Sequence, residues 1–131
     1  MEIDRSIPIL IVDDNQAMRR LLADIVRNAG FKNLVFAEDG MIALQKLGEA
    51  SFSLVFLDWD MPRKNGLEVL EAMRASEALA HVPVIMVTAK AEQDKVMAAI
   101  AGGVSNYVVK PYTPNSIYKK MQAVLCAKDA V

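Results

Sequence analysis

The amino-acid sequence predicts an α/β domain in which a parallel sheet of five strands is covered by helices on both faces. Apolar runs rich in β-branched residues alternate with amphipathic helical patterns five times along the chain. A chain of 131 residues is also long enough to bury a sizeable core without disulfides or a structural metal. We therefore expect one domain spanning residues 1–131.

Five short apolar runs are the expected strands, near residues 7–12, 33–37, 52–57, 82–87 and 105–109. The first and third runs, Ile-Pro-Ile-Leu-Ile-Val and Phe-Ser-Leu-Val-Phe-Leu, are apolar almost throughout. Such runs are typical of parallel strands that are buried on both faces.

Five helical patterns separate and follow these runs, near residues 15–29, 39–49, 66–76, 91–102 and 114–126. In the first, Met18, Leu21, Leu22, Ile25 and Val26 share one face, which should pack on the sheet, and a glycine at position 30 provides a stop. The sequence Ala-Glu-Asp-Gly opens the second helix. A Thr-Pro pair at 113–114 suits the cap and first position of the last helix.

Composition excludes several classes of function. Fifteen basic and sixteen acidic residues leave a formal net charge of −1, so we expect no direct binding of nucleic acid. Cys126 is the only cysteine, which excludes an internal disulfide and favours a reduced compartment. No apolar stretch is long enough for a membrane span, and the charged first residues do not resemble a signal peptide. We expect a cytoplasmic monomer that does not bind membranes.

Charged and hydroxyl side chains stand where the expected strands end. Asp13 and Asp14 follow the first strand, Asp58 the third, Thr88 the fourth and Lys110 the fifth. Because the carboxyl ends of parallel strands form the crevice where ligands bind, these residues are expected to converge.

Three converging carboxylates repel one another, and a bound divalent cation would offset their charge. Oxygen ligands favour Mg²⁺, whereas Zn²⁺ usually takes histidine or cysteine ligands, and His81 is the only histidine. The predicted cofactor is therefore Mg²⁺, held by Asp13 and Asp14.

Asp58 is the predicted nucleophile, because a carboxylate beside a cation can attack an in-line phosphoryl group. Lys110 would pair with the phosphoryl oxygens, and the Thr88 hydroxyl would contact another oxygen. Simpler roles remain open: Asp14 and Thr88 could be helix caps, and Lys110 could be a solvated loop lysine.

Six motifs, taken together, resemble the receiver domain of two-component response regulators, and within that family the chemotaxis subfamily. They are Ile11–Asp14, Ala37–Gly40, Leu57–Pro62, Asn65–Gly66, Val87–Ala89 and Val109–Thr113. Their order and spacing match the family over almost the whole chain. We read Asn65 as a structural turn residue that tolerates positive φ.

The resemblance implies a flavodoxin-like fold with strand order 2-1-3-4-5 and phosphotransfer from a histidine kinase to Asp58. It also implies Mg²⁺ ligation by Asp13, Asp14, Asp58 and the backbone carbonyl of Asp60. Such a domain catalyses only its own phosphorylation and slow dephosphorylation. In the family the peptide bond corresponding to Lys110–Pro111 is cis.

The resemblance further implies a switch in which Thr88 moves towards the phosphoryl group and Tyr107 turns inward. This would change the surface formed by the fourth helix, fifth strand and fifth helix, which would bind a flagellar motor switch protein or another output protein, or a phosphatase. Tyr107 could instead be an ordinary half-buried strand aromatic. Asp60 and Lys90 occupy positions that affect the lifetime of the phosphoryl group in the family.

Two other functions are weighed against a separate chemotaxis receiver. The chain could be the receiver domain of a larger response regulator or hybrid kinase. Alternatively, Asp58-Trp59-Asp60 is similar to the nucleophile loop of haloacid-dehalogenase-type phosphatases. In those enzymes the loop follows the first strand, whereas here it follows the third, and no later acidic pair is present to bind metal.

Overall fold

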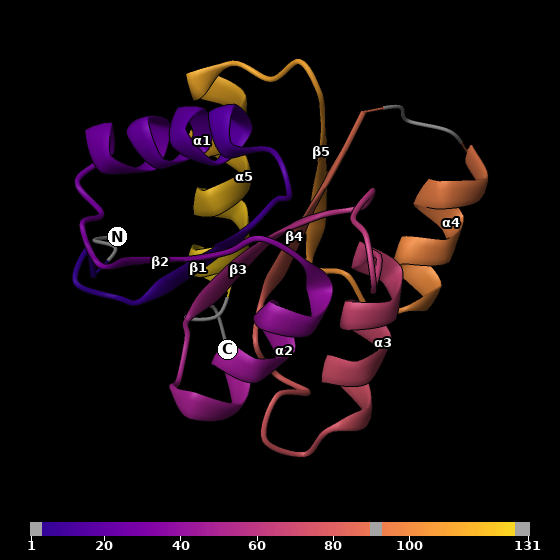
Figure 1. Ribbon diagram of the computed structural model, residues 1–131. Coiled ribbons are helices and arrows are strands. Elements are labelled where there is room, and N and C mark those ends of the chain that lie inside the picture. The colour runs from indigo at the N-terminus through magenta and orange to yellow at the C-terminus, as the bar shows by residue number, and fades with distance from the viewer. Residues whose placement is uncertain (1–3, 90–92, 128–131) are drawn as a thin grey trace.

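Five parallel strands form a single sheet in the order β2-β1-β3-β4-β5 (Figure 1), as predicted. The computed structural model describes residues 4–89 and 93–127. The strands are β1 (Ile9–Val12), β2 (Leu34–Ala37), β3 (Leu54–Asp58), β4 (Val84–Thr88) and β5 (Asn106–Val109). The helices are α1 (Gln16–Asn28), α2 (Gly40–Glu49), α3 (Gly66–Ala75), α4 (Gln93–Ala101) and α5 (Pro114–Ala127).

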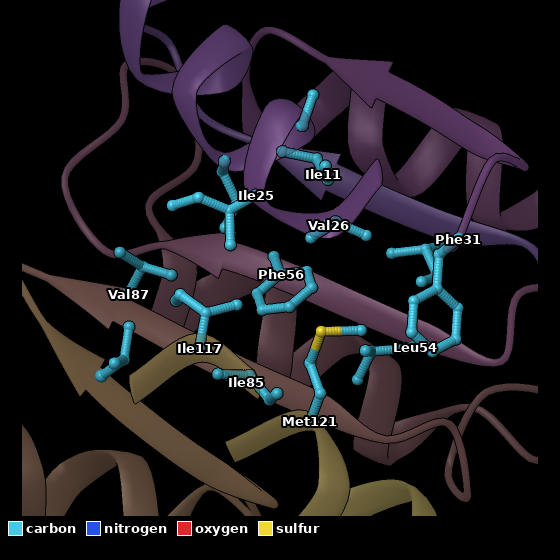
Figure 2. Close-up of a cluster of buried hydrophobic side chains, with 14 of the residues drawn as sticks. Ile11, Ile25, Val26, Phe31, Leu54, Phe56, Ile85, Val87, Ile117 and Met121 are labelled. Carbon is cyan, nitrogen blue, oxygen red and sulfur yellow. The ribbon is translucent and has the colours of Figure 1, made fainter. Parts of the chain in front are cut away.

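The helices cover the sheet in two layers, with α1 and α5 on one face and α2, α3 and α4 on the other (Figure 1). Alternate residues of each strand enter opposite cores, because successive strand side chains point to opposite faces. Phe56 of β3 packs between Val26 of α1 and Ile117 of α5 (Figure 2). Its neighbours Val55 and Leu57 belong to the core on the other face. None of the described helices combines the length and apolar character needed to cross a bilayer.

Helix starts follow local capping chemistry. The side chain of Asn15 accepts a hydrogen bond from the backbone N–H of Met18, so α1 begins one residue later than expected. Asp39 caps α2 in the same way. At the last helix, the Thr113 hydroxyl accepts a hydrogen bond from the Ser116 N–H, as the sequence predicted.

The structural role expected for Asn65 is confirmed, but its backbone conformation and the burial of Leu21 differ from expectation. Asn65 has φ −77° and is the N-cap of α3, where it forms a reciprocal capping box with Glu68. The positive φ in this loop, 69°, belongs to Arg63 instead. In α1, Leu21 was expected in the core, but the residue is 47% exposed, whereas Ala23 is buried.

Gly40 allows α2 to begin directly against the loop that follows β3. A Cβ atom at this position would lie 2.3 Å from the backbone oxygen of Lys64, a distance at which backbone must move. A Cβ atom at Gly48, in the same helix, would meet no atom within 4 Å. The two glycines of α2 therefore differ in structural role.

We expect Gly40→Ala to lower the free energy of unfolding by about 1–3 kcal/mol, because the added methyl group overpacks a backbone contact. Gly48→Ala is the matched control and should raise it by about 0.5–1 kcal/mol, since alanine favours the helix and meets no clash. Urea denaturation of both variants measures these changes. Equal effects of the two substitutions would contradict the proposed contact.

Candidate phosphoryl-acceptor site

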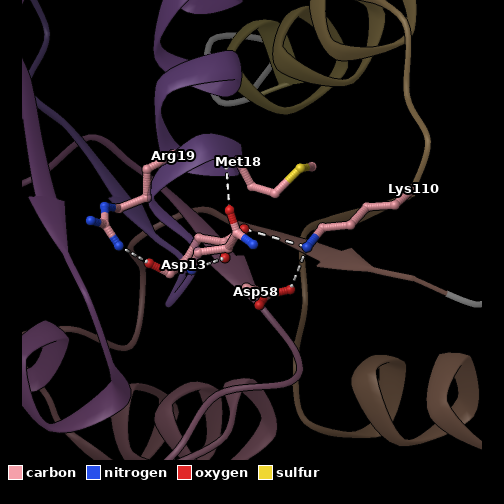
Figure 3. Close-up of polar contacts among 6 residues, drawn as sticks. Asp13, Met18, Arg19, Asp58 and Lys110 are labelled. Atoms are coloured by element: carbon pink, nitrogen blue, oxygen red, sulfur yellow. Dashed lines mark hydrogen bonds and ion pairs between the residues drawn. The ribbon is translucent and has the colours of Figure 1, made fainter.

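The ends of β1, β3 and β5 bring Asp13, Asp58 and Lys110 together (Figure 3). The ammonium group of Lys110 lies 3.2 Å from Oδ1 of Asp58 and 3.4 Å from Oδ2 of Asp13. Both carboxylates are buried, and the lysine side chain is largely buried. The alternative of a solvated loop lysine is therefore wrong.

Both oxygens of Asp13 have protein partners, because Oδ1 accepts a hydrogen bond of 2.9 Å from the backbone N–H of Asn15. The backbone carbonyl of Asp13 also accepts a hydrogen bond of 2.7 Å from the Arg19 guanidinium (Figure 3). The sequence interpretation missed this role for Arg19. A basic residue one turn into a helix that follows an acidic strand end is the available signal.

Asp14 completes an acidic cluster at the same edge of the sheet. One carboxylate oxygen from each of Asp13, Asp14 and Asp58 lies within 4.8 Å of the others. Asp14 is exposed and is not the cap of α1, a role that Asn15 fills. Three carboxylates face one lysine, so the cluster has an excess of negative charge. Its oxygen donors and charge fit a hard divalent cation that keeps some of its water ligands.

Burial and charge repulsion act together on Asp58. Burial raises its pKa to about 6, the Asp13 carboxylate adds to the increase, and Lys110 opposes it. For Lys110, burial acts to lower the pKa, but Asp58 and Asp13 outweigh burial and raise the pKa above its usual range. The lysine therefore remains a cation beside the carboxylates.

Thr88 is the last residue of β4 and is buried. Its backbone oxygen accepts a hydrogen bond of 2.7 Å from the N–H of Lys110, which ties the two strand ends together. Thr88 pairs with Val109 of β5 in the sheet. The peptide bond between Lys110 and Pro111 is cis.

Comparison with known proteins agrees with this geometry. The family model described as "Response regulator receiver domain" matches residues 9–122. The chain belongs to the response regulator receiver family. Phosphorylation coupled to a partner-binding switch is the general function of this family, and its members are signalling proteins. This membership also argues against the haloacid-dehalogenase interpretation.

Chemotaxis proteins are among the relatives of this receiver. It is 43% identical to the chemotaxis protein CheY of Pseudomonas aeruginosa over 116 residues, covering 88% of this chain and 94% of the relative. Chemotaxis protein CheY-3 of Vibrio cholerae is 38% identical over 122 residues, covering 93% and 94%. The structure of V. cholerae CheY4 superposes with a TM-score of 0.85 at 30% identity, over 92% of this chain and 99% of that protein.

Asp60, Lys90 and Tyr107 are the remaining residues that the sequence predicted to matter for function. Asp60 is exposed in the loop after β3, and Lys90 lies outside the described residues. Tyr107 is half-buried on β5, and the ammonium group of Lys120 lies 5.5 Å from the centre of its ring. The strand position of Tyr107 agrees with either of the roles considered for it.

Tyr112 is a further residue whose relation to the cluster the sequence did not reveal. Burial raises the pKa of its phenol to about 12, and the negative charges of Asp13 and Asp58 contribute to the rise. The phenol therefore stays protonated beside the acidic cluster. Its place two positions after a strand-end lysine, within the Val109–Thr113 motif, is the signal that the sequence offers.

The raised pKa of Asp58 predicts a pH-dependent stability. The folded state binds this proton more tightly than the unfolded chain, in which the pKa of Asp58 has its ordinary value of 3.8. The contribution of Asp58 to folding stability is therefore largest below pH 3.8 and is lost as the pH rises through about 6. In metal-free buffer, Asp58→Asn should be more stable than the parent at about pH 8, and the difference should shrink as the pH falls.

Thermal unfolding in the presence of a chelator, at several pH values, measures this difference. Asp24→Asn, on the exposed surface of α1, is the control and should show no such trend. A stability difference that does not vary with pH for Asp58→Asn would contradict the assignment.

Proposed function

We propose that this receiver accepts a phosphoryl group on Asp58 from the phosphohistidine of a histidine kinase. The observation that supports this most directly is the buried Asp58 carboxylate at a strand end, 3.2 Å from Lys110 and beside two further acids. A buried carboxylate with a cation partner and a raised pKa is a reasonable nucleophile at neutral pH, because it is ionised but poorly solvated.

In the proposed reaction, a carboxylate oxygen of Asp58 forms a bond to phosphorus as the bond from phosphorus to the imidazole nitrogen breaks. The departing histidine keeps the electron pair and takes up a proton. Lys110 turns from its carboxylate partners to the phosphoryl oxygens, where its positive charge stabilises the transition state. The Thr88 hydroxyl binds another phosphoryl oxygen.

Mg²⁺ is the proposed cofactor, with Asp13, Asp14, Asp58 and the backbone carbonyl of Asp60 as its protein ligands. When bound, it neutralises the charge that gathers on the carboxylate and phosphoryl oxygens. Support comes from the acidic cluster and from a related receiver domain, that of the P. aeruginosa sensor histidine kinase PA1611. Its structure has a magnesium ion coordinated in the active-site cleft, with a TM-score of 0.85 at 23% identity over 92% of this chain and 98% of that one.

The proposed output is a change in the surface formed by α4, β5 and α5, triggered when Thr88 moves towards the phosphoryl group and Tyr107 turns inward. A pocket of about 280 Å³ lies on this surface between Tyr107, Tyr112 and Lys120. On α4, Met97 and Ile100 are exposed and offer apolar contact to a partner. Given the chemotaxis relatives, the proposed partner is a flagellar motor switch protein, and the proposed compartment is the cytoplasm.

The central test is to incubate the protein with Mg²⁺ and acetyl phosphate and to measure its intact mass. We expect one phosphoryl adduct that requires Mg²⁺ and is absent from Asp58→Asn, because the amide cannot act as the nucleophile. Asp24→Asn, on the surface of α1, should still form the adduct. An adduct that persists in Asp58→Asn would place the acceptor elsewhere.

Asp60 is proposed to affect how long the phosphoryl group lasts, because it is exposed and lies two residues after Asp58, a position that affects this lifetime in the family. Asp60→Asn should change the rate of dephosphorylation severalfold, since it removes a negative charge but keeps the backbone carbonyl. Loss of phosphate from the purified phosphoprotein gives this rate. An unchanged half-life would eliminate this role.

A further inference from the structure

The start of α2 and the loop after β3 are joined by a buried carboxylate. The Asp39 side chain is about 10% exposed, and its Oδ1 accepts a hydrogen bond of 2.8 Å from the Ile42 N–H. Its Oδ2 lies 3.4 Å from Nη1 of Arg63. Helix capping needs only one of the two oxygens, so the second is available to hold the loop.

Arg63 has a backbone conformation that is unfavourable for its side chain. Its φ is 69°, and the Lys64 N–H donates a hydrogen bond of 2.8 Å to the Pro62 oxygen. A hydrogen bond between residues i and i+2 closes a γ-turn, and a positive φ at its central residue defines the rarer and more strained form. Strained backbone of this kind persists only where surrounding contacts maintain it.

Two contacts are placed to maintain this turn. One is the ion pair between Arg63 and Asp39. The other is the close approach of the Lys64 backbone oxygen to Gly40, the first residue of α2. Asp39 thus contacts the side chain of Arg63, and Gly40 lies against the backbone of Lys64. These two consecutive residues stand at the start of α2.

The turn lies within a loop that is closed on the phosphoryl-acceptor strand. The Gly66 N–H donates a hydrogen bond of 2.8 Å to the backbone oxygen of Trp59. A Cβ atom on Gly66 would lie 2.4 Å from the backbone oxygen of Asp58. The segment 59–65 therefore spans between fixed ends, with Asp60 inside it. A change in the turn at Arg63 alters where the Asp60 carbonyl can lie.

We propose that Asp39 and Arg63 are positioning residues that hold the loop of residues 59–65 in the conformation needed for metal binding. The metal part of this inference rests on the proposed function, because it takes the Asp60 carbonyl as a Mg²⁺ ligand. The part about the loop conformation does not, since it rests on the ion pair and the turn alone. An ion pair with one exposed partner shifts a conformational equilibrium by up to about fivefold. This factor is comparable with the one by which a positive φ disfavours the turn at a residue other than glycine.

The test uses Asp39→Asn, which keeps a capping oxygen for Ile42 and removes the charge, and Arg63→Gln, which keeps a side chain at the positive φ but removes the guanidinium. Hydrogen exchange of the Lys64 amide is measured in the metal-free proteins, and Mg²⁺ affinity by titration of Trp59 fluorescence. We expect faster amide exchange in both variants and a Mg²⁺ Kd raised about threefold to fivefold. Combining the substitutions should add little, because both remove the same ion pair.

Arg27→Gln is the matched control, because it removes another arginine–aspartate pair, that with Asp24 on the surface of α1. It should leave amide exchange and Mg²⁺ affinity unchanged. Unchanged exchange of the Lys64 amide in both test variants would overturn the proposal. So would a change in exchange and Mg²⁺ affinity in Arg27→Gln as large as that in the test variants. If the parent protein binds no Mg²⁺, the proposed metal site fails, and the exchange measurement alone decides whether the pair holds the loop.

Discussion

Repulsion among three carboxylates at one edge of the sheet is the constraint on which the rest of the site depends. Asp13, Asp14 and Asp58 are close enough to share a cation, and Lys110 offsets only part of their charge. The lysine in turn requires β5 to end beside β4, which the hydrogen bond from its N–H to the Thr88 oxygen ensures. Folding alone therefore leaves a negatively charged site that attracts a cation.

The sequence predicted the architecture well because the strands are buried on both faces. Continuous apolar runs and repeated strand–helix units require a covered parallel sheet, and the residues that end such strands must meet at one edge. The strand order needed the family resemblance, since periodicity does not say which strands are neighbours. The proximity of Asp58 to Lys110 followed from topology, whereas their roles in phosphotransfer stay predictions.

What the sequence did not predict depended on side-chain direction and on contacts between distant segments. The Asn-Gly pair at residues 65–66 resembled a turn with positive φ, but Asn65 is the cap of α3, and the positive φ in this loop is at Arg63. Leu21 fits the apolar face of α1 by spacing but lies too near the margin of that face to be covered. The contact of Arg19 with the Asp13 carbonyl depends on the local path of the chain, which composition does not specify.

The division of the interior by the sheet has a consequence for how this protein tolerates change. The core beneath α1 and α5 and the core beneath α2, α3 and α4 draw on different side chains of the same strands. A layer of hydrogen-bonded backbone separates the two cores. The effects of a substitution in one core and a substitution in the other on the free energy of unfolding are therefore expected to add. The sheet thus makes the molecule modular: one layer can diversify to suit new partners while the other keeps its packing.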